Sequence, residues 1–257
     1  MKIALFSDIH ANLPALEAVL NDIEIQNIDA VYCLGDLVGY ANWPNEVIQE
    51  IRKRKIATIA GNYDQGVGFS SEDCGCAYKS DADQDRGVQS INYTNSIVTA
   101  ENRAYLRMLP SHIEIKYQNN DEHFNILLVH GSPRKINEYL TEDRPDISLI
   151  RLMQEYNAHI LCYGHTHKPY HKKLEVKQDN SISYLHAINI GSVGKPKDGD
   201  VRACYVIMDI DKEASLKKEN GIKVEFRRVS YDIEKVAKAV EESPLPNEFA
   251  DMLRKAY

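Results

Sequence analysis

The chain has 257 residues, enough for one large domain or two small ones, and its 31 Lys and Arg against 38 Asp and Glu give a formal net charge of −7. This acidic balance argues against a general nucleic-acid binder, which carries a basic field over its footprint, but it leaves a specific nuclease open. No apolar run approaches the roughly 20 residues that cross a membrane, and the apolar N-terminal run ends before Asp8, too early for a secretion signal.

Strand and helix patterns alternate in the first third of the chain. Short apolar runs at residues 2–7, 30–34 and 56–60 predict buried strands. Apolar residues at helical spacing predict helices at 12–26 and 44–54, the first with Asn12 as its N-cap and Pro14 in its first turn. Strands that alternate with helices predict parallel crossovers and the α/β class.

A stretch rich in glycine and acidic residues, 66–87, interrupts this alternation and predicts a loop. We expect an active-site flap, inserted over residues 66–95. Within it, Cys74 and Cys76 are compatible with a metal site or a redox pair, but a solvated loop is favoured because no other pair of thiols lies nearby in sequence. The five scattered cysteines resemble no disulfide framework, so we expect a reduced, cytoplasmic protein.

The remaining chain is richer in strands. Helices are expected at 88–97, 101–109, 146–156, 232–241 and 247–255. Strands are expected at 113–117, 124–129, 158–163, 170–176, 183–189, 203–210 and 222–229, with turns at 119–121 and 178–180. No repeat or linker interrupts this pattern, so we expect a single domain over residues 1–257, with two sheets and outer helices.

Candidate metal ligands follow five of the predicted strands. Because ligands bind at the carboxyl ends of strands in open α/β sheets, side chains far apart in sequence can converge there. Residues in Asp-x-His or His-x-His spacing can both turn toward one centre, and adjacent glycines allow the backbone to approach closely. The candidates are Asp8, His10, Asp36, Asn62, His130, His165 and His167.

The chemistry of this set indicates transition metals. Two carboxylates, four imidazoles and one amide, without thiolate, suit Mn, Fe, Zn, Co or Ni better than calcium or an iron–sulfur cluster. Two divalent cations held by only two carboxylates leave a cationic site, which attracts a phosphate ester and stabilises charge in the transition state. Each motif alone is weak evidence for a metal site, but five such motifs in order, each after a predicted strand, are hard to explain as coincidence.

The motif series SDIH, GDLVGY, GNYD, HGSP and GHTH, followed by NIGSVGKPKDGD, resembles the calcineurin-like metallophosphoesterase superfamily. The compact bacterial and archaeal phosphodiesterases are the most similar branch, and the resemblance runs from Met1 to about Ile210. It implies a four-layer α/β/β/α sandwich with two mixed sheets and a metal site at the strand C-terminal ends. It also implies two divalent transition-metal ions, with Mn favoured, and phosphodiester hydrolysis by a metal-bridging hydroxide.

The resemblance assigns a role to each motif residue. One metal would be held by Asp8, His10 and His167, the other by Asn62, His130 and His165, with Asp36 bridging both. The catalytic set would be Asp36, Asn62, Tyr63 and His165. The segment Gly191-Ser192-Val193-Gly194 would pack beside the metals through its backbone, and Lys195 and Lys197 either reach the substrate phosphate or are solvated loop charges.

Tyr63 departs from the family pattern. Many members have His in Gly-Asn-His-Asp, where it stabilises the transition state and protonates the leaving oxygen. Tyrosine, with a reference pKa of about 10, carries no positive charge at neutral pH. Losing a general acid costs roughly 10²–10⁴ in rate with a poor leaving group, so Tyr63 favours a diester or an activated substrate.

Other candidate residues have ordinary explanations. Asp64 is expected to orient a neighbour rather than bind metal, and Tyr40 and Trp43 either stack on a base or aryl ester or pack in the core. The remaining histidines are expected to be structural or exposed, with His186 the strongest exception. They are His112, His123, His159, His171 and His186.

Two alternatives to a phosphodiesterase stay open. One is a non-catalytic scaffold on the same fold, and the other is a nucleotide-polyphosphate hydrolase or nuclease. The expected substrate is a small phosphate ester. Nucleic acid is disfavoured as a partner, and no membrane association is expected. A homodimer is expected, as in many compact relatives.

Overall fold

The computed structural model describes residues 1–76, 80–119, 122–178 and 181–257, and two mixed five-stranded sheets form its centre. In the first sheet the parallel strands β1, β2 and β3 continue into two antiparallel strands, β9 and β10. Its order is β10 (Lys223–Val229), β9 (Ala203–Asp209), β1 (Lys2–Phe6), β2 (Ala30–Cys33) and β3 (Ala57–Thr58).

The second sheet has three parallel strands flanked by an antiparallel strand at each edge. Its order is β4 (His112–Asn119), β5 (Glu122–Val129), β6 (Ile160–Tyr163), β8 (Ser181–Asn189) and β7 (Tyr170–Gln178). The predicted turns at 119–121 and 178–180 include residues 120, 121, 179 and 180, which lie outside the described residues.

Central strands such as β1, β6 and β9 are buried on both faces, which explains why they are near-continuous apolar runs. Alternate residues point to opposite faces, so Ile3 and Leu5 of the first sheet meet Ile126 and Leu128 of the second in the core between the sheets. Phe6 points the other way, into the core under α1 (Leu13–Glu24) and α2 (Pro44–Lys53).

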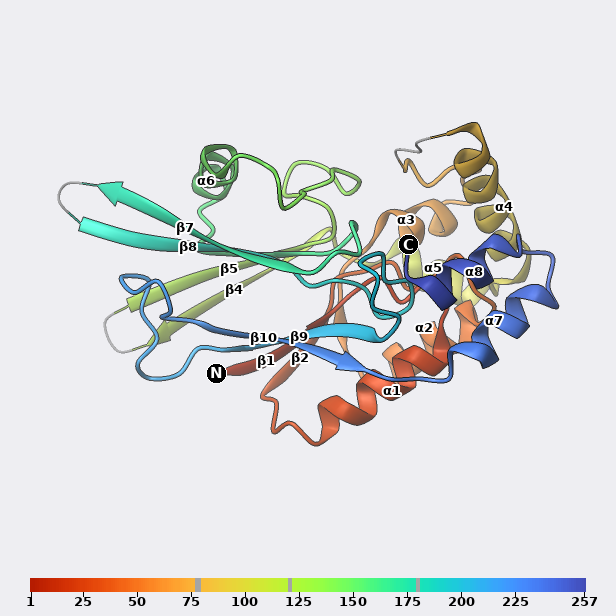
Figure 1. Cartoon of the computed structure of the whole chain (residues 1–257), viewed down its shortest axis with the longest axis horizontal. Coiled ribbons are helices and arrows are strands. Elements are labelled where there is room, and N and C mark those ends of the chain that lie inside the picture. The colour runs from red at the N-terminus through yellow and green to blue at the C-terminus, as the bar shows by residue number, and fades with distance from the viewer. Residues whose placement is uncertain (77–79, 120–121, 179–180) are drawn as a thin grey trace.

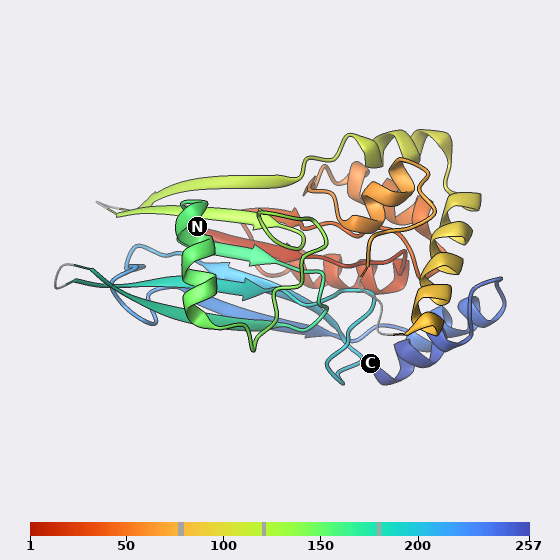
Figure 2. The same ribbon diagram turned by 90° about the horizontal axis from the view of Figure 1, so that it is seen from above.

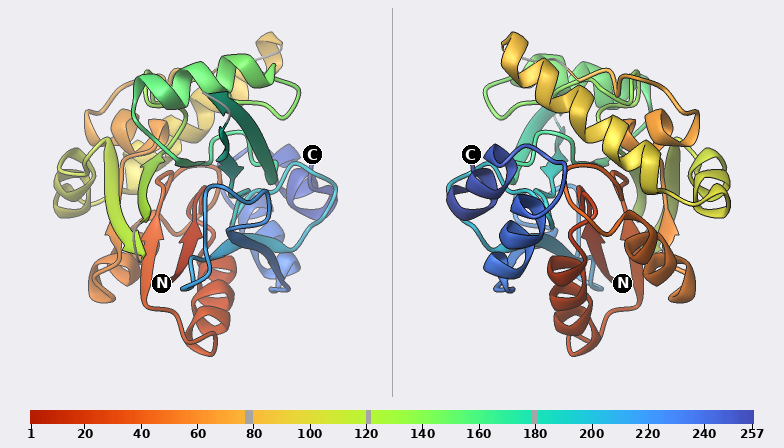
Figure 3. Two further views of the ribbon diagram at one scale, coloured as in Figure 1. Left: turned by 90° about the vertical axis from the view of Figure 1, so that its left-hand side faces the viewer. Right: turned by 90° about the vertical axis from the view of Figure 1, so that its right-hand side faces the viewer.

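The outer face of the second sheet is covered by α6 (Asp146–Glu155), whose Leu149, Leu152 and Met153 pack against Leu127 and Leu161. Figure 2 shows α6 lying across these strands, and Figure 3 shows α1 and α6 on opposite sides with the strands between them. The order helix, sheet, sheet, helix confirms the predicted four-layer sandwich.

The other helices gather at one end of the molecule, toward which β1 runs (Figure 1). They are α3 (Asn62–Gly68), α4 (Asp81–Ile97), α5 (Ala100–Arg107), α7 (Ile233–Glu241) and α8 (Glu248–Lys255). In the described part of the chain, no helix combines the length and the apolar character needed to cross a membrane.

The loop predicted over 66–87 is wrong in part, because α3 extends to Gly68 and α4 already begins at Asp81. The Ser80 side chain accepts a hydrogen bond from Asp83 N, and Asp81 and Asp83 lie in the first turn, where the helix dipole favours negative charge. Asp81 and Asp83, two of the acidic residues that suggested a loop, therefore start a helix.

Candidate metal centre

Five loops that follow strands converge at the helix-rich end of the sheets. Asp8 and His10 follow β1, Asp36 follows β2, and Asn62 begins α3 after β3. On the second sheet the other ligands follow two neighbouring parallel strands, β5 and β6. The structure brings the seven predicted ligands together in two adjoining groups.

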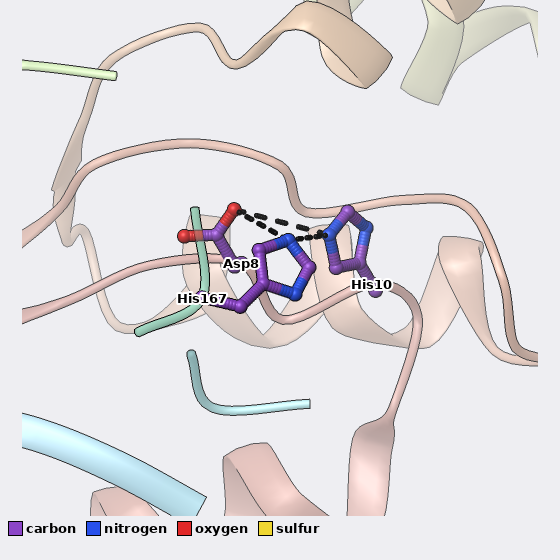
Figure 4. Close-up of side chains that lie close together, drawn as sticks. All are labelled: Asp8, His10 and His167. Carbon is purple, nitrogen blue, oxygen red and sulfur yellow. Dashed lines mark hydrogen bonds and ion pairs between the residues drawn. The ribbon is translucent and has the colours of Figure 1, made fainter. Parts of the chain in front are cut away.

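The first group consists of Asp8, His10 and His167, whose ligand atoms point toward one another (Figure 4). His167 Nε2 lies 3.2 Å from His10 Nε2 and 3.3 Å from Asp8 Oδ1, and His10 Nε2 lies 3.8 Å from the same oxygen. Two ligand atoms bound about 2.1 Å from one ion at 90–110° are separated by about 3.0–3.4 Å. The two distances from His167 Nε2 fall in this range, and the third, from His10 Nε2 to Asp8 Oδ1, is 0.4 Å above it.

The second group consists of Asp36, His130 and His165, joined by the amide of Asn62. His130 Nε2 lies 3.1 Å from Asn62 Oδ1 and 3.4 Å from Asp36 Oδ2. Asp36 Oδ2 is also 3.6 Å from His10 Nε2 of the first group. One carboxylate oxygen thus faces both groups.

Backbone carbonyls fix which nitrogen of three histidines faces the centre. Nδ1 of His10 donates to Val38 O over 3.0 Å, and Nδ1 of His130 donates to Leu34 O over 2.8 Å. Nδ1 of His167 donates in the same way to Lys195 O. A carbonyl can only accept, so the neutral imidazoles present an Nε2 lone pair to the centre, as in metal-ligating histidines generally.

Two buried atoms at the centre strengthen this assignment. Within the described residues, Asp8 Oδ1 and His165 Nε2 have no hydrogen-bond partner. A buried polar atom without a partner is costly, and bound metal ions would satisfy both atoms. The donor set and these atoms fit two divalent cations.

Burial and mutual charge govern protonation in the metal-free chain. Burial lowers the pKa of His10 to about 3 and that of His165 to about 4, which leaves both imidazoles neutral. Burial acts on His130 in the same direction, but the Asp36 carboxylate overrides it and raises the pKa of His130 to about 10. Burial alone would raise the pKa of Asp36, and the facing His130 holds it below its usual range. A cation bound beside Asp36 must therefore displace a proton from His130.

Five of the seven candidate ligands adopt a left-handed backbone conformation, which few residues other than glycine adopt. Strain of this kind clusters at functional sites. Here it lets consecutive residues at a strand end point into one centre. The residues are Asp8 (φ 55°), His10 (50°), Asp36 (54°), His165 (64°) and His167 (60°).

Two glycines allow these loops to touch. A Cβ at Gly61 would lie 2.1 Å from Asp36 Oδ1, and a Cβ at Gly164 would lie 2.4 Å from Asp8 Oδ2. Any side chain at either position would displace a ligand.

Asp64 lies outside both groups and orients the loop that carries Asp36. Its Oδ2 accepts hydrogen bonds from the backbone N–H of Asp36 (2.7 Å) and of Gly61 (2.9 Å), and its Oδ1 accepts one from Leu37 N (2.8 Å). One carboxylate thereby ties the turn after β2 to the start of α3.

The segment 191–194 packs against the loop after β1 through two backbone N–H groups and the Ser192 hydroxyl. Gly194 N and Ser192 Oγ donate to Asp8 O over 2.9 and 2.8 Å, and Val193 N donates to Ser7 O over 2.9 Å. A Cβ at Gly194 would lie 1.7 Å from Ile9 O, so this contact requires glycine.

A cavity of about 660 Å³ opens over the two groups. Lys195, only 5% exposed, and Lys197 line it, and Lys195 Nζ lies 4.6 Å from the centre of the Tyr40 ring. Burial lowers the pKa of both amines. Of the two aromatic candidates, Tyr40 lines the cavity, whereas Trp43 packs against the core under α7 and α8.

Tyr63 is buried at the cavity wall. Its ring lies 4.8 Å from the Tyr40 ring and 5.5 Å from the His10 ring, measured between centroids, and its backbone N–H donates to Asp36 Oδ1 over 2.9 Å. The position that usually holds the family histidine therefore faces the same space as the candidate ligands.

The cysteine pair contradicts the solvated loop expected for it. Cys74 is buried, Cys76 is half-buried and lines the cavity, and Asn62 Nδ2 donates to Cys74 O over 3.0 Å. The Asn62 amide is thereby turned so that its oxygen faces His130. This contact links residues that have no common sequence motif.

Several cavity residues carry no signal in the sequence. The Tyr139 ring packs 4.2 Å from the His165 ring, and Arg86 of α4 and Phe249 of α8 complete the wall. His186 is fully buried beside His171 on β7, with 2.9 Å between the ring nitrogens, and belongs to neither of the two groups found in the described chain.

Comparisons with known proteins agree with this geometry. The calcineurin-like phosphoesterase superfamily domain matches residues 1–213. An uncharacterised protein of Methanocaldococcus jannaschii is 34% identical over 98% of this chain and 96% of its own length. A metallophosphoesterase from Sphaerobacter thermophilus is 28% identical with a TM-score of 0.73, covering 100% of this chain and 99% of that one. A hypothetical protein from Pyrococcus horikoshii (24% identity, 100% and 98% coverage, TM-score 0.77) shares the fold.

Proposed function

The chain belongs to the calcineurin-like phosphoesterase superfamily, and from this premise we propose that it is a dinuclear metal-dependent phosphoesterase that preferentially hydrolyses phosphodiesters. Membership of the superfamily implies hydrolysis of phosphate esters and divalent metal ions. The number of ions, the residue roles and the diester preference are our proposal. The observation that carries it is Asp36 Oδ2, which lies 3.6 Å from His10 Nε2 and 3.4 Å from His130 Nε2, between the two groups.

We assign one cation to Asp8, His10 and His167 and the other to Asn62, His130 and His165, with Asp36 shared. When bound, two such cations supply an activated water at neutral pH and positive charge on the phosphoryl oxygens. The deep burial of the ligands supports this assignment, because charge interactions strengthen where water is excluded.

The chain's own side chains would bind and orient the substrate. Lys195 and Lys197 add amine groups to the cavity beyond the metal ligands, where they can donate hydrogen bonds to a phosphate oxygen. The Tyr139 ring, which packs against His165, and the Tyr63 ring, which packs against His10, would form walls for the substrate.

The diester preference follows from Tyr63. A tyrosine hydroxyl can donate a hydrogen bond but carries no positive charge at neutral pH, so the site lacks the usual cationic acid for a poor leaving group. An aryl or otherwise activated diester needs that acid least.

The decisive experiment measures hydrolysis of an aryl phosphodiester with Mn²⁺. We expect turnover that is abolished by a chelator and by Asp36→Asn, and retained in Asp143→Asn, which changes an exposed carboxylate in the same way. Inactivity with every divalent metal and ester would instead support the non-catalytic scaffold.

A nucleotide-polyphosphate hydrolase is the second candidate. The cavity combines Lys195, Lys197 and Arg86 with the rings of Tyr40 and Phe249, groups that suit several phosphates and a base. Comparing nucleoside polyphosphates, nucleic acid and simple diesters as substrates separates these functions.

We also propose that residues 1–257 form a single domain, with residues 66–95 as an active-site flap. Phe249 of α8 packs edge-on against Tyr40, 5.0 Å between ring centroids, and Asp83 and Arg86 of α4 line the cavity.

Manganese as the metal, a cytoplasmic location and a homodimer stay predictions.

A further inference from the structure

Two thiols lie side by side next to a candidate metal ligand. Cys74 Sγ and Cys76 Sγ are 2.9 Å apart, and Asn62 Nδ2 donates to Cys76 Sγ over 3.2 Å. The proposed function uses neither thiol.

We propose that Cys74 and Cys76 form a reversible disulfide that weakens metal binding at the Asn62 group. The inference rests on the proposed function for its consequence, but the bond itself can be measured independently of any activity. An S–S bond of about 2.05 Å needs only a small approach of the two sulfur atoms.

The loop is already shaped to hold the thiols together. Gly75 between them has φ +69°, its N–H donates to Asp73 Oδ1 over 2.9 Å, and its carbonyl accepts from Asn137 Nδ2 over 2.7 Å. A Cβ at Gly75 would lie 2.8 Å from that Asn137 nitrogen, so a larger residue would disturb this turn.

The unequal exposure of the two thiols sets the order of reaction. Half-buried Cys76 lines the cavity and can meet a peroxide, whereas Cys74 is 6% exposed. Cys76 attacks the peroxide, the O–O bond breaks, and sulfenic acid and water form. Cys74 then attacks the sulfenic sulfur, releasing a second water, so that two thiols and one peroxide give one disulfide and two waters. A dithiol reductant reverses the reaction by exchange.

The new bond would act on the metal centre through one amide. Asn62 Nδ2 is held by Cys74 O and Cys76 Sγ, and these contacts aim its oxygen at His130. Drawing Cys76 Sγ toward Cys74 would weaken the contact between Asn62 Nδ2 and this sulfur. A contact that orients a ligand is worth about 10–100-fold in metal affinity, and we expect a loss of this size at the second group, with the first group unchanged.

Disulfide formation between Cys74 and Cys76 is tested by treating the metal-free protein with hydrogen peroxide. The hydrogen bond to Cys74, together with burial, raises the pKa of the Cys76 thiol, so we expect slow oxidation and a long incubation. Peptide mapping should show a Cys74–Cys76 cross-link with a mass loss of two hydrogens, reversed by dithiothreitol. Cys33, Cys162 and Cys204, buried in the core, serve as internal controls. Two unlinked thiols at the end of this long incubation would overturn the proposal.

The expected loss of metal affinity is tested by titrating Mn²⁺ into the reduced and oxidised protein. We expect two ions in the reduced form and one tight ion in the oxidised form, while Cys74→Ala, which retains Cys76 beside Asn62, keeps two after the same treatment. A disulfide that leaves both affinities unchanged contradicts the inference. A chain that binds two ions, loses one on oxidation and cleaves no phosphate ester would refute the proposed function and leave this inference standing.

Discussion

Gly164→Ala should remove one metal ion by adding a single methyl group. The new Cβ would lie 2.4 Å from Asp8 Oδ2 and 2.6 Å from Ser7 Oγ, where ordinary contacts begin at 3.4 Å. Asp8 must therefore move by about 1 Å, and metal–ligand distances tolerate only about 0.2 Å. Overpacking of this kind costs about 1–3 kcal/mol of stability, which a domain with about 5–15 kcal/mol can survive.

We expect Gly164→Ala to fold, to bind at the first group at least about 100-fold more weakly than the natural chain, and to retain the second ion. Calorimetric titration with Mn²⁺ and elemental analysis of the dialysed protein measure both quantities. Gly199→Ala is the matched control: it strains a residue with φ +83°, but its Cβ meets nothing within 4 Å. If Gly164→Ala binds two ions with unchanged affinity, the packing of Gly164 against Asp8 does not position a ligand, and the reasoning fails.

Three further predictions follow from the same geometry. Tyr63→His should raise turnover of alkyl esters by up to roughly 10²-fold and change aryl esters little, because only poor leaving groups need a cationic acid; equal effects on both, in steady-state assays, would remove Tyr63 from the mechanism. Asp36 raises the pKa of His130 from 6.5 to about 10, so the metal-free chain should lose stability as pH rises from about 7 through 10. Because Mn²⁺ must displace the His130 proton, its affinity should rise about tenfold per pH unit over that range. A melting temperature and a Mn²⁺ affinity that do not change with pH would contradict both expectations. Lys197→Ala should raise KM for an anionic ester about tenfold with little change in kcat, whereas Lys168→Ala at the cavity rim should not; equal KM values in the two variants would place Lys197 outside substrate binding.

Much of the fold follows from local pattern, because the central strands are buried on both faces. Strands such as β1 and β6 are short apolar runs, and Asn12 caps α1 by accepting from Ala15 N as its position predicts. The order of ligand-bearing loops follows as well, since parallel strands place their carboxyl ends at one edge. Residue type, order and strand position were therefore enough to nominate the ligands.

Other features depend on contacts that no local pattern encodes. The left-handed conformation of Asp8 and His165 is imposed by surrounding loops. Gly164 before His165 hints at it, but no glycine adjoins Asp8 in the sequence. The helix starting at Asp81 was missed because acidic residues serve both loops and first turns. The place of Cys76 beside Asn62 arises from tertiary packing alone.

The central claim is that two cations share the Asp36 carboxylate, and anomalous diffraction from crystals grown with Mn²⁺ tests it most directly. We predict two manganese peaks about 3.5–4 Å apart, one bound by Asp8, His10 and His167, the other by Asn62, His130 and His165. A single peak, or manganese bound away from Asp36, would contradict it.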